Sequence, residues 1–121
     1  LVKYYPGLDP KIIDFIISSG YKAIIFEGTG LGHIGKIMYE YVDKAKKKGL
    51  FMGMTSQCID GMVRMTVYES GRDLLNLGII PLSNMIPETA LVKAMWALGN
   101  SKNPEEMEKL MKENIALEFS D

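Results

Sequence analysis

The chain has 121 residues, of which 47% are hydrophobic and 24% charged, and its formal net charge is −1. These values are typical of one globular domain spanning residues 1–121, and they exclude a disordered chain and a chain with the basic surface that nucleic acids bind. The single cysteine excludes an internal disulfide, and no apolar run approaches the roughly 20 residues that cross a membrane, so we expect a cytoplasmic protein with no membrane contact.

The first residues, LVKYYPG, contain no initiator methionine and already have the pattern of a strand. We therefore expect the chain to be a piece of a longer protein. Such a piece can carry half of an active site.

The first half of the chain alternates short apolar runs with amphipathic helices. Apolar residues spaced by three and four predict the helices, Asp9-Pro10 is a start signal, and Gly20 and Gly49 are end signals. The expected elements are strands over 2–5, 23–26 and 50–56 and helices over 10–19 and 35–48.

The second half begins with a different pattern over residues 62–68. Apolar Val63, Met65 and Val67 alternate with Arg64, Thr66 and Tyr68. Strict alternation predicts an extended segment with one face in water, either an edge strand or a flap.

The remaining elements are a short helix over 71–77, a fourth strand over 78–82, a helix over 87–98 and a last helix. In the helix over 87–98 we expect Leu91, Met95 and Leu98 to face inward. The last helix starts at Asn103-Pro104, where Glu106 is placed to complete a capping box. Its expected apolar stripe is Met107, Leu110, Met111 and Ile115.

Strands and helices in this order predict an α/β domain with a parallel sheet of about four strands, a small three-layer flavodoxin-like (Rossmann-like) fold. Ligands of such sheets bind at the carboxyl ends of the strands. Polar loops follow three of the predicted strands, at 6–7, 27–33 and 56–58. We expect these loops to meet at one edge of the sheet.

The loop FEGTGLGHIGK at 26–36 nearly matches two phosphate-binding signatures, through Gly30, Gly32 and Gly35 and through Lys36. A dinucleotide site needs an acidic residue about 20 positions later, and LFMGMTSQ at 50–57 has none. A P-loop needs Ser or Thr after the lysine, and Ile37 has no oxygen for magnesium. Two alternatives remain open, a tight turn without a ligand and a turn whose N–H groups bind a carboxylate.

His33, the only histidine, lies on this loop, and Cys58 follows the neighbouring strand. His33 is therefore a candidate for hydrogen bonding to a substrate or for reaching a neighbouring chain. A Cys58–His33 hydrolase is a further alternative, against a cysteine that is simply packed. One histidine and one cysteine predict no metal site without distant carboxylates.

Three longer stretches, taken together, resemble the carboxyl-terminal domain of the L-asparaginase family. They are EGTGLGH at 27–33, MTSQCIDGMVRMTVYESGRDLLNLGIIP at 54–81 and PETALVKAMWALGNSKNPEEMEKLMKENIALEFSD at 87–121. The resemblance covers essentially the whole chain and is strongest to the archaeal tRNA-dependent amidotransferase subunits.

This resemblance implies hydrolysis of the side-chain amide of asparagine or glutamine through a threonine nucleophile and an acyl-enzyme, without a cofactor. In the amidotransferase branch the ammonia passes to a second subunit, which converts Glu-tRNA(Gln) to Gln-tRNA(Gln) and accounts for any use of ATP. The family's catalytic threonines lie in an amino-terminal domain. Thr29, Thr55, Thr66 and Thr89 do not lie in those motifs, so we expect no catalytic residue in this chain and no activity of the chain alone.

The resemblance also implies that loops of this domain complete the active site of the neighbouring subunit in a homodimer. It assigns substrate-binding roles to Gly30, Gly32, His33 and Tyr68. His33 falls where many asparaginases have an asparagine, which weakens a strict transfer of the role. Cys58 falls at a position that lines an effector pocket in some bacterial members.

Three alternatives to this assignment stay open. One is a stand-alone L-asparaginase domain, another is a nucleotide-binding or effector-binding module, and the third is a domain that serves assembly alone. For assembly, the helix over 87–98 and the segment over 62–68 are the candidate interfaces.

Overall fold

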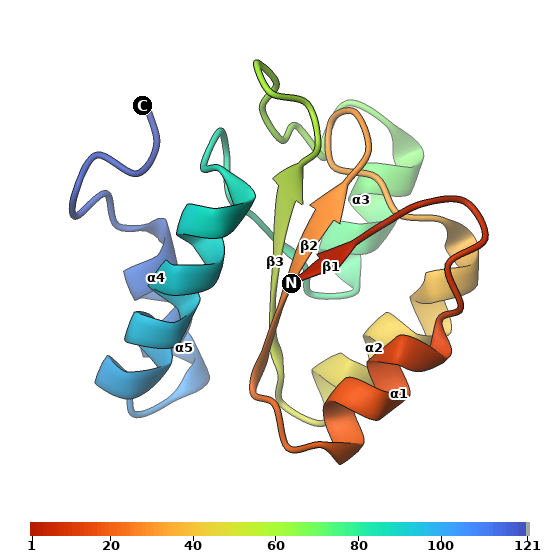
Figure 1. The fold of residues 1–121 in the computed structure, drawn as a ribbon, viewed down its shortest axis with the longest axis horizontal. Coiled ribbons are helices and arrows are strands. Elements are labelled where there is room, and N and C mark those ends of the chain that lie inside the picture. Colours follow the sequence, from red (N-terminus) through yellow and green to blue (C-terminus); the bar gives the residue numbers. More distant parts are fainter. Residues whose placement is uncertain (121) are drawn as a thin grey trace.

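The computed structural model describes residues 1–120, and in this range a four-stranded parallel sheet separates two helical layers (Figure 1). The strands are β1 (Val2–Lys3), β2 (Ala23–Gly28), β3 (Phe51–Ser56) and β4 (Ile80–Pro81), in the order β1-β2-β3-β4. The helices are α1 (Lys11–Ser18), η1 (Lys36–Met38), α2 (Tyr39–Lys47), α3 (Glu69–Asn76), α4 (Pro87–Asn100) and α5 (Pro104–Lys112). The predicted α/β class and parallel sheet are confirmed.

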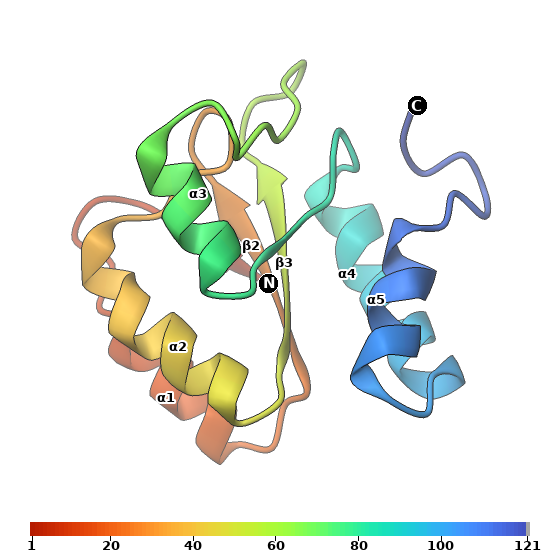
Figure 2. The same ribbon diagram turned by 180° about the vertical axis from the view of Figure 1, so that it is seen from behind.

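The sequential strand order decides where the helices lie. Right-handed crossovers between successive parallel strands place their helices on the same face of a sheet. Accordingly α1, α2 and α3 cover one face, and α4 and α5, which follow the last strand, cover the other (Figures 1 and 2).

Side chains that alternate along β2 build one core on each face of the sheet. Ile24 and Phe26 point into the core beneath α1, α2 and α3, whereas Ile25 points into the core shared with α4 and α5. All three side chains are buried. The apolar run that predicted β2 thus reflects a strand covered on both faces.

Both predicted helix starts that carry a cap are found, with small shifts. Asp9 accepts the Lys11 N–H through Oδ1 at 3.0 Å, although α1 itself begins at Lys11. At α5, Asn103 Oδ1 accepts the Glu106 N–H at 2.8 Å. The Glu106 carboxylate reaches back to the N–H of Lys102 at 2.7 Å, one residue before the position that a capping box uses.

Of the two alternatives for residues 62–68, an edge strand or a flap, the edge strand is wrong. Val63 and Met65 are buried and Arg64 is exposed, as the alternation predicted, but the backbone pairs with loops instead of a strand. The Val63 N–H donates to Ser83 O at 2.9 Å and the Arg64 N–H to Leu31 O at 3.0 Å. The chain then turns into α3, which begins at Glu69, two residues before the predicted start.

The predicted inward face of α4 is also wrong, because Met95 is 66% exposed and Leu98 37% exposed. The buried residues are a proline, three alanines and a lysine, namely Pro87, Ala90, Lys93, Ala94 and Ala97. α4 packs directly on β2, β3 and α5, and small side chains permit that close approach. Ile115 lies beyond α5, which ends at Lys112, and is exposed.

Candidate functional site

The carboxyl ends of β1, β2 and β3 are joined by the side chain and backbone of Gln57. Its Nε2 donates to Tyr4 O at 2.5 Å and to Glu27 O at 3.0 Å, and its backbone N–H donates to Gly28 O at 2.8 Å. One residue therefore fixes the relative positions of three strand ends. The loops over 27–33 and 56–58 meet at this edge as expected, and the contact with β1 is made at Tyr4, before the loop over 6–7.

The glycine-rich loop over residues 29–33 is closed by pairing between its two ends. Thr29 N–H donates to His33 O and His33 N–H to Thr29 O, both at 2.9 Å. Ser56 Oγ donates to Gly30 O at 2.6 Å, which anchors the loop to β3. Within residues 1–120, the N–H groups of Gly30 and Leu31 donate to no protein acceptor, so they are free to bind a ligand.

Gly32 and Gly35 are required by packing. Gly32 has a φ of +100°, and a Cβ there would lie 2.9 Å from both Met54 Cγ and Val63 Cγ1. A Cβ on Gly35 would lie 2.2 Å from the Tyr4 hydroxyl oxygen. These contacts explain two of the three glycines of the phosphate-like signature, Gly32 and Gly35, without a nucleotide. The helix α2 begins only at Tyr39, after the short η1 turn.

A hollow of about 190 Å³ lies between this loop and the start of α3. Four predicted substrate-binding residues, Gly30, Gly32, His33 and Tyr68, line it together. We call it the loop pocket; its full lining is Thr29, Gly30, Leu31, Gly32, His33, Arg64, Met65, Tyr68, Ser70 and Gly71. Residues 33 and 68 are far apart in sequence, so their meeting is a result of the fold.

The wall of the loop pocket is supported from two directions. The Tyr4 ring meets the His33 ring edge to face, with centroids 6.5 Å apart and an angle of 88° between the planes. On the other side, the Tyr39 hydroxyl donates to Ser70 O at 3.2 Å. Burial raises the pKa of this hydroxyl above its ordinary value of 10.0, and the charge of Asp73 adds to the rise, so Tyr39 stays a donor at neutral pH.

Arg64 is the residue of the loop pocket that sequence reasoning missed. It lies on the polar side of the alternating segment, and its N–H is held by Leu31 O at 3.0 Å. An arginine that lines a pocket is suited to an anionic ligand. The available signal was that Arg64 is the one charged residue on the polar side of the alternating segment over 62–68.

Cys58 lies apart from these residues. It lines a second hollow, of about 200 Å³, with Glu27, Ser56, Gln57 and the segment over 83–88. Its backbone N–H donates to Ser56 Oγ at 3.0 Å, and the residue is exposed. His33 is absent from this hollow, so the two partners of the Cys58–His33 alternative face different spaces.

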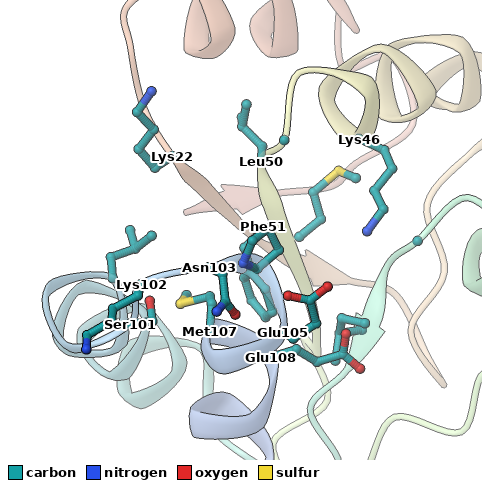
Figure 3. Close-up of a pocket in the computed structure, with 16 residues that line it drawn as sticks. Lys22, Lys46, Leu50, Phe51, Ser101, Lys102, Asn103, Glu105, Met107 and Glu108 are labelled. Carbon is teal, nitrogen blue, oxygen red and sulfur yellow. The ribbon is translucent and has the colours of Figure 1, made fainter.

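The largest hollow, of about 630 Å³, lies at the opposite edge, where the strands begin (Figure 3). Its charged side chains have mixed signs, with Lys22, Lys46 and Lys102 on one hand and Glu105 and Glu108 on the other. No predicted site residue lines it. Because parallel sheets bind ligands at the carboxyl ends of their strands, we place the candidate site in the smaller loop pocket.

Residues 1–120 contain neither a metal-binding cluster nor a helix suited to a membrane. No group of three or more His, Cys, Asp or Glu side chains in this range is arranged to hold a metal ion. Within the same range, no helix combines the length and apolarity needed to cross a membrane.

Comparison with known proteins identifies relatives over nearly the whole chain. A glutamyl-tRNA(Gln) amidotransferase subunit of Metallosphaera sedula is 52% identical over 120 residues, and the corresponding protein of Pyrococcus abyssi is 49% identical. Each match covers 99% of this chain and 27% of the relative, so the chain spans about a quarter of the length of these relatives.

Two solved structures of L-asparaginases contain a domain with the fold of this chain. The thermostable L-asparaginase from Thermococcus kodakarensis superposes with a TM-score of 0.89 at 36% identity, over 99% of this chain and 37% of that one. L-asparaginase I from Vibrio cholerae gives a TM-score of 0.86 at 26% identity, over 98% of this chain and 36% of that one.

A protein-family model matches nearly the whole chain. The Glutaminase/Asparaginase C-terminal domain model matches residues 1–111. The match begins at the first strand, includes the loop pocket and ends within α5. This chain therefore belongs to the family of glutaminase and asparaginase carboxyl-terminal domains.

Proposed function

We propose that the chain is the carboxyl-terminal part of an amidohydrolase that releases ammonia from asparagine or glutamine for a tRNA-dependent amidotransferase. The names of the relatives at about half identity support this assignment. The observation that carries it is the loop pocket, which His33, Tyr68 and Arg64 line together with Gly30 and Leu31. The proposal extends to a cytoplasmic location.

In this role the loop pocket binds the amino-acid end of the substrate. An α-carboxylate needs hydrogen-bond donors and positive charge, and the Gly30 and Leu31 N–H groups and the Arg64 guanidinium provide both. His33 and Tyr68, at the rim of the pocket, contact the remainder of the amino-acid end. A hollow of about 190 Å³ is too small for a nucleotide and suits the end of one amino acid.

The attacking threonine comes from an amino-terminal domain. Within this chain Thr55 is buried and donates to Phe26 O at 2.8 Å, and Thr29 donates to His33 O at 3.3 Å. A hydroxyl bonded to a backbone carbonyl has no base to activate it. In this proposal the chain supplies binding groups and not the nucleophile, and the chemistry needs no metal or cofactor.

The proposed partners follow from this division of labour. They are the amino-terminal domain, a homodimer partner whose active site these loops complete, and a second amidotransferase subunit that carries the tRNA and uses any ATP. Cys58, in its separate hollow, is proposed only as a contact for an effector.

The test is the substitution His33→Ala in the protein that includes the threonine-bearing domain. We expect KM for the amide substrate to rise roughly tenfold with a smaller change in kcat, because a lost hydrogen bond to a charged substrate costs about 1.5 kcal/mol or more. Lys109→Ala, on the exposed side of α5, is the control and leaves KM unchanged.

The isolated 121-residue chain gives the complementary measurement. It shows no asparaginase or glutaminase activity by itself, and adding the amino-terminal domain in trans restores part of it. Robust turnover by the isolated chain, or an unchanged KM in the His33 variant, contradicts the proposal.

A second candidate is a stand-alone L-asparaginase, favoured by the TM-score of 0.89 to the Thermococcus kodakarensis enzyme. The two candidates differ in what accepts the ammonia. Asparagine hydrolysis that is unaffected by the second subunit and its tRNA favours the stand-alone enzyme. Stimulation by them favours the amidotransferase.

A further inference from the structure

His33 has a fixed backbone, but hydrogen bonds do not fix its side chain. Its N–H and its carbonyl both pair with Thr29, at 2.9 Å each. The side chain is exposed, and within residues 1–120 no protein group forms a hydrogen bond with the imidazole nitrogens. Both nitrogens are therefore available to a ligand, and another contact has to set the direction of the ring.

The contact that the structure provides is the ring of Tyr4, the residue after β1. The two rings meet edge to face, with 88° between their planes and 6.5 Å between their centroids. Aromatic pairs prefer this arrangement, at centroid distances of about 4.5–7 Å, because the positive edge of one ring attracts the negative face of the other. The contact is attractive and depends on direction, so the imidazole loses it by rotating away.

Tyr4 is itself held firmly. Its N–H donates to Glu27 O at 3.0 Å, and its carbonyl accepts from Gln57 Nε2 at 2.5 Å. Its side chain is half-buried and packs on the core beneath α1, α2 and α3. The ends of β2 and β3 therefore fix the position of Tyr4, which presents a fixed surface to His33.

The Tyr4 ring also lies against Gly35, two residues after His33. A Cβ on Gly35 would lie 2.2 Å from the Tyr4 hydroxyl oxygen and 3.1 Å from Cζ. The backbone of Gly35 has a φ of −66° and a ψ of 154°, a conformation that any residue adopts. Gly35 is therefore required by the position of the Tyr4 ring and not by its own backbone.

Ile34, between these two residues, is fully buried in the core. The segment over 33–35 is thus anchored at its centre, and the residue on each side of the anchor contacts the same tyrosine ring.

We propose that Tyr4 is a positioning residue of the loop pocket, whose ring holds the His33 imidazole in the direction in which it meets the substrate. Tyr4 does not line the loop pocket, so it acts through His33. The effect on substrate rests on the proposed function. The contact between the two rings does not, because it is present in the chain without a ligand.

A ring held in one direction before binding favours affinity. An exposed side chain that samples several rotamers loses conformational entropy when a ligand fixes it, and a side chain that is already held loses less. Removing the Tyr4 ring is therefore expected to raise KM with little change in kcat, which is the kinetic sign of lost binding.

The first test is proton NMR of the 121-residue chain, in which His33 is the only histidine. Its carbon-bound imidazole protons can therefore be assigned without ambiguity. We expect nuclear Overhauser contacts between these protons and the Tyr4 ring, and chemical shifts displaced from those of the urea-unfolded chain. Tyr4→Phe keeps the displacement, whereas Tyr4→Leu loses most of it. Tyr21→Leu is the matched control and keeps it, because Tyr21 is exposed and precedes β2 at the opposite edge of the sheet.

The second test disturbs the same contact from Gly35. The methyl group of Gly35→Ala displaces the Tyr4 ring, so we expect the His33 resonances to move as they do in Tyr4→Leu. Tyr4→Phe removes the oxygen that makes the closest approach, so the double variant Gly35→Ala/Tyr4→Phe returns toward the wild-type shifts. This pair decides the question if Tyr4→Leu does not fold.

The third test is a double-mutant cycle in the protein that includes the threonine-bearing domain. We expect Tyr4→Leu to raise KM for the amide substrate by roughly twofold to tenfold. The same substitution has no further effect in a His33→Ala background, because Tyr4 acts through His33. Independent, additive effects of the two substitutions would mean a general structural role and would overturn the proposal.

NMR and kinetics separate the two proposals. If His33→Ala leaves KM unchanged, the proposed function fails, and the NMR results still decide whether Tyr4 orients the ring. Imidazole resonances that match the unfolded chain, or that are indifferent to Tyr4→Leu and Gly35→Ala, overturn the role of Tyr4 whatever the kinetics. So does a double variant no closer to the wild type than Gly35→Ala alone.

Discussion

The helices on the two faces of the sheet bury their apolar residues differently. In α2 and α3 the inward residues, such as Val42 and Leu74, are the apolar ones, and charged side chains face outward. In α4 the inward residues are alanines and the larger apolar side chains face outward. In α2 and α3 the apolar side chains are therefore buried or half-buried by this chain, whereas α4 leaves its larger apolar side chains exposed.

The two surfaces discussed above also lie in different layers of the molecule. The loop pocket belongs to the first layer, since it is formed by the loop after β2 and the start of α3. The exposed side of α4 and the segment after α5, where Glu118 pairs with Lys93 at 2.8 Å, belong to the second. If the layers act independently, substitutions in the second leave ligand binding in the first unchanged.

The largest effect is expected for Arg64→Ala in the protein that includes the threonine-bearing domain. Loss of a charged hydrogen bond to the substrate carboxylate costs about 1.5–3 kcal/mol, or roughly 10-fold to 150-fold in kcat/KM. Steady-state kinetics measures it, and sedimentation of the variant stays as in the wild type. A variant whose sedimentation changes while its kcat/KM does not would contradict a role of Arg64 in substrate binding.

Next in size is Gly32→Ala, compared with Gly30→Ala. At Gly32 the new Cβ collides with Met54 and Val63 and the φ of +100° adds strain, so we expect a loss of about 1–3 kcal/mol in the free energy of unfolding. At Gly30 the space is open and φ is +52°, so only the left-handed backbone costs energy, about 1–2 kcal/mol, and the loss is smaller than at Gly32. Urea denaturation of both variants compares them, and equal losses would contradict the packing role of Gly32.

A smaller, pH-dependent effect is expected in the second layer. The hydrogen bond from Lys93 lowers the pKa of the Glu118 carboxyl from its ordinary value of 4.5 to about 2. Because the folded pKa is the lower one, the stabilisation is fully present above pH 4.5 and is lost as the pH falls through about 2.

Thermal denaturation of the wild type and Glu118→Gln measures this effect. The wild type is the more stable near neutral pH, and the difference between the two narrows in acid. A difference that does not change with pH would mean that Glu118 acts by packing alone.

The smallest expected effect concerns nucleotides. A ligand present at 100 times its dissociation constant stabilises a protein by about 2.7 kcal/mol. With NAD, ATP or GTP we expect no change in the thermal midpoint of the chain. The reason is that side chains of this chain already fill the space beside Gly32 and Gly35. A clear rise would restore the nucleotide-binding alternative.

Local patterns predicted most of the fold. Period, capping and the rule for parallel sheets predicted the strands and the helix starts at Asp9-Pro10 and Asn103-Pro104. They also predicted that the loops over 27–33 and 56–58 meet at one edge. The resemblance to asparaginases indicated Gly30, Gly32, His33 and Tyr68, and the structure brings them into one pocket. Their roles in substrate binding stay predictions.

The sequence by itself determined the class of the fold, the order of its elements and its family, because these depend on local periodicity and on motifs that can be read along the chain. Tertiary structure alone decided which side of α4 is buried, since a helix that is apolar all round has no preferred face until its neighbours are placed. It also decided that residues 62–68 pair with loops and that Arg64 joins the loop pocket. Those outcomes depend on contacts between residues distant in sequence, which a local pattern does not contain.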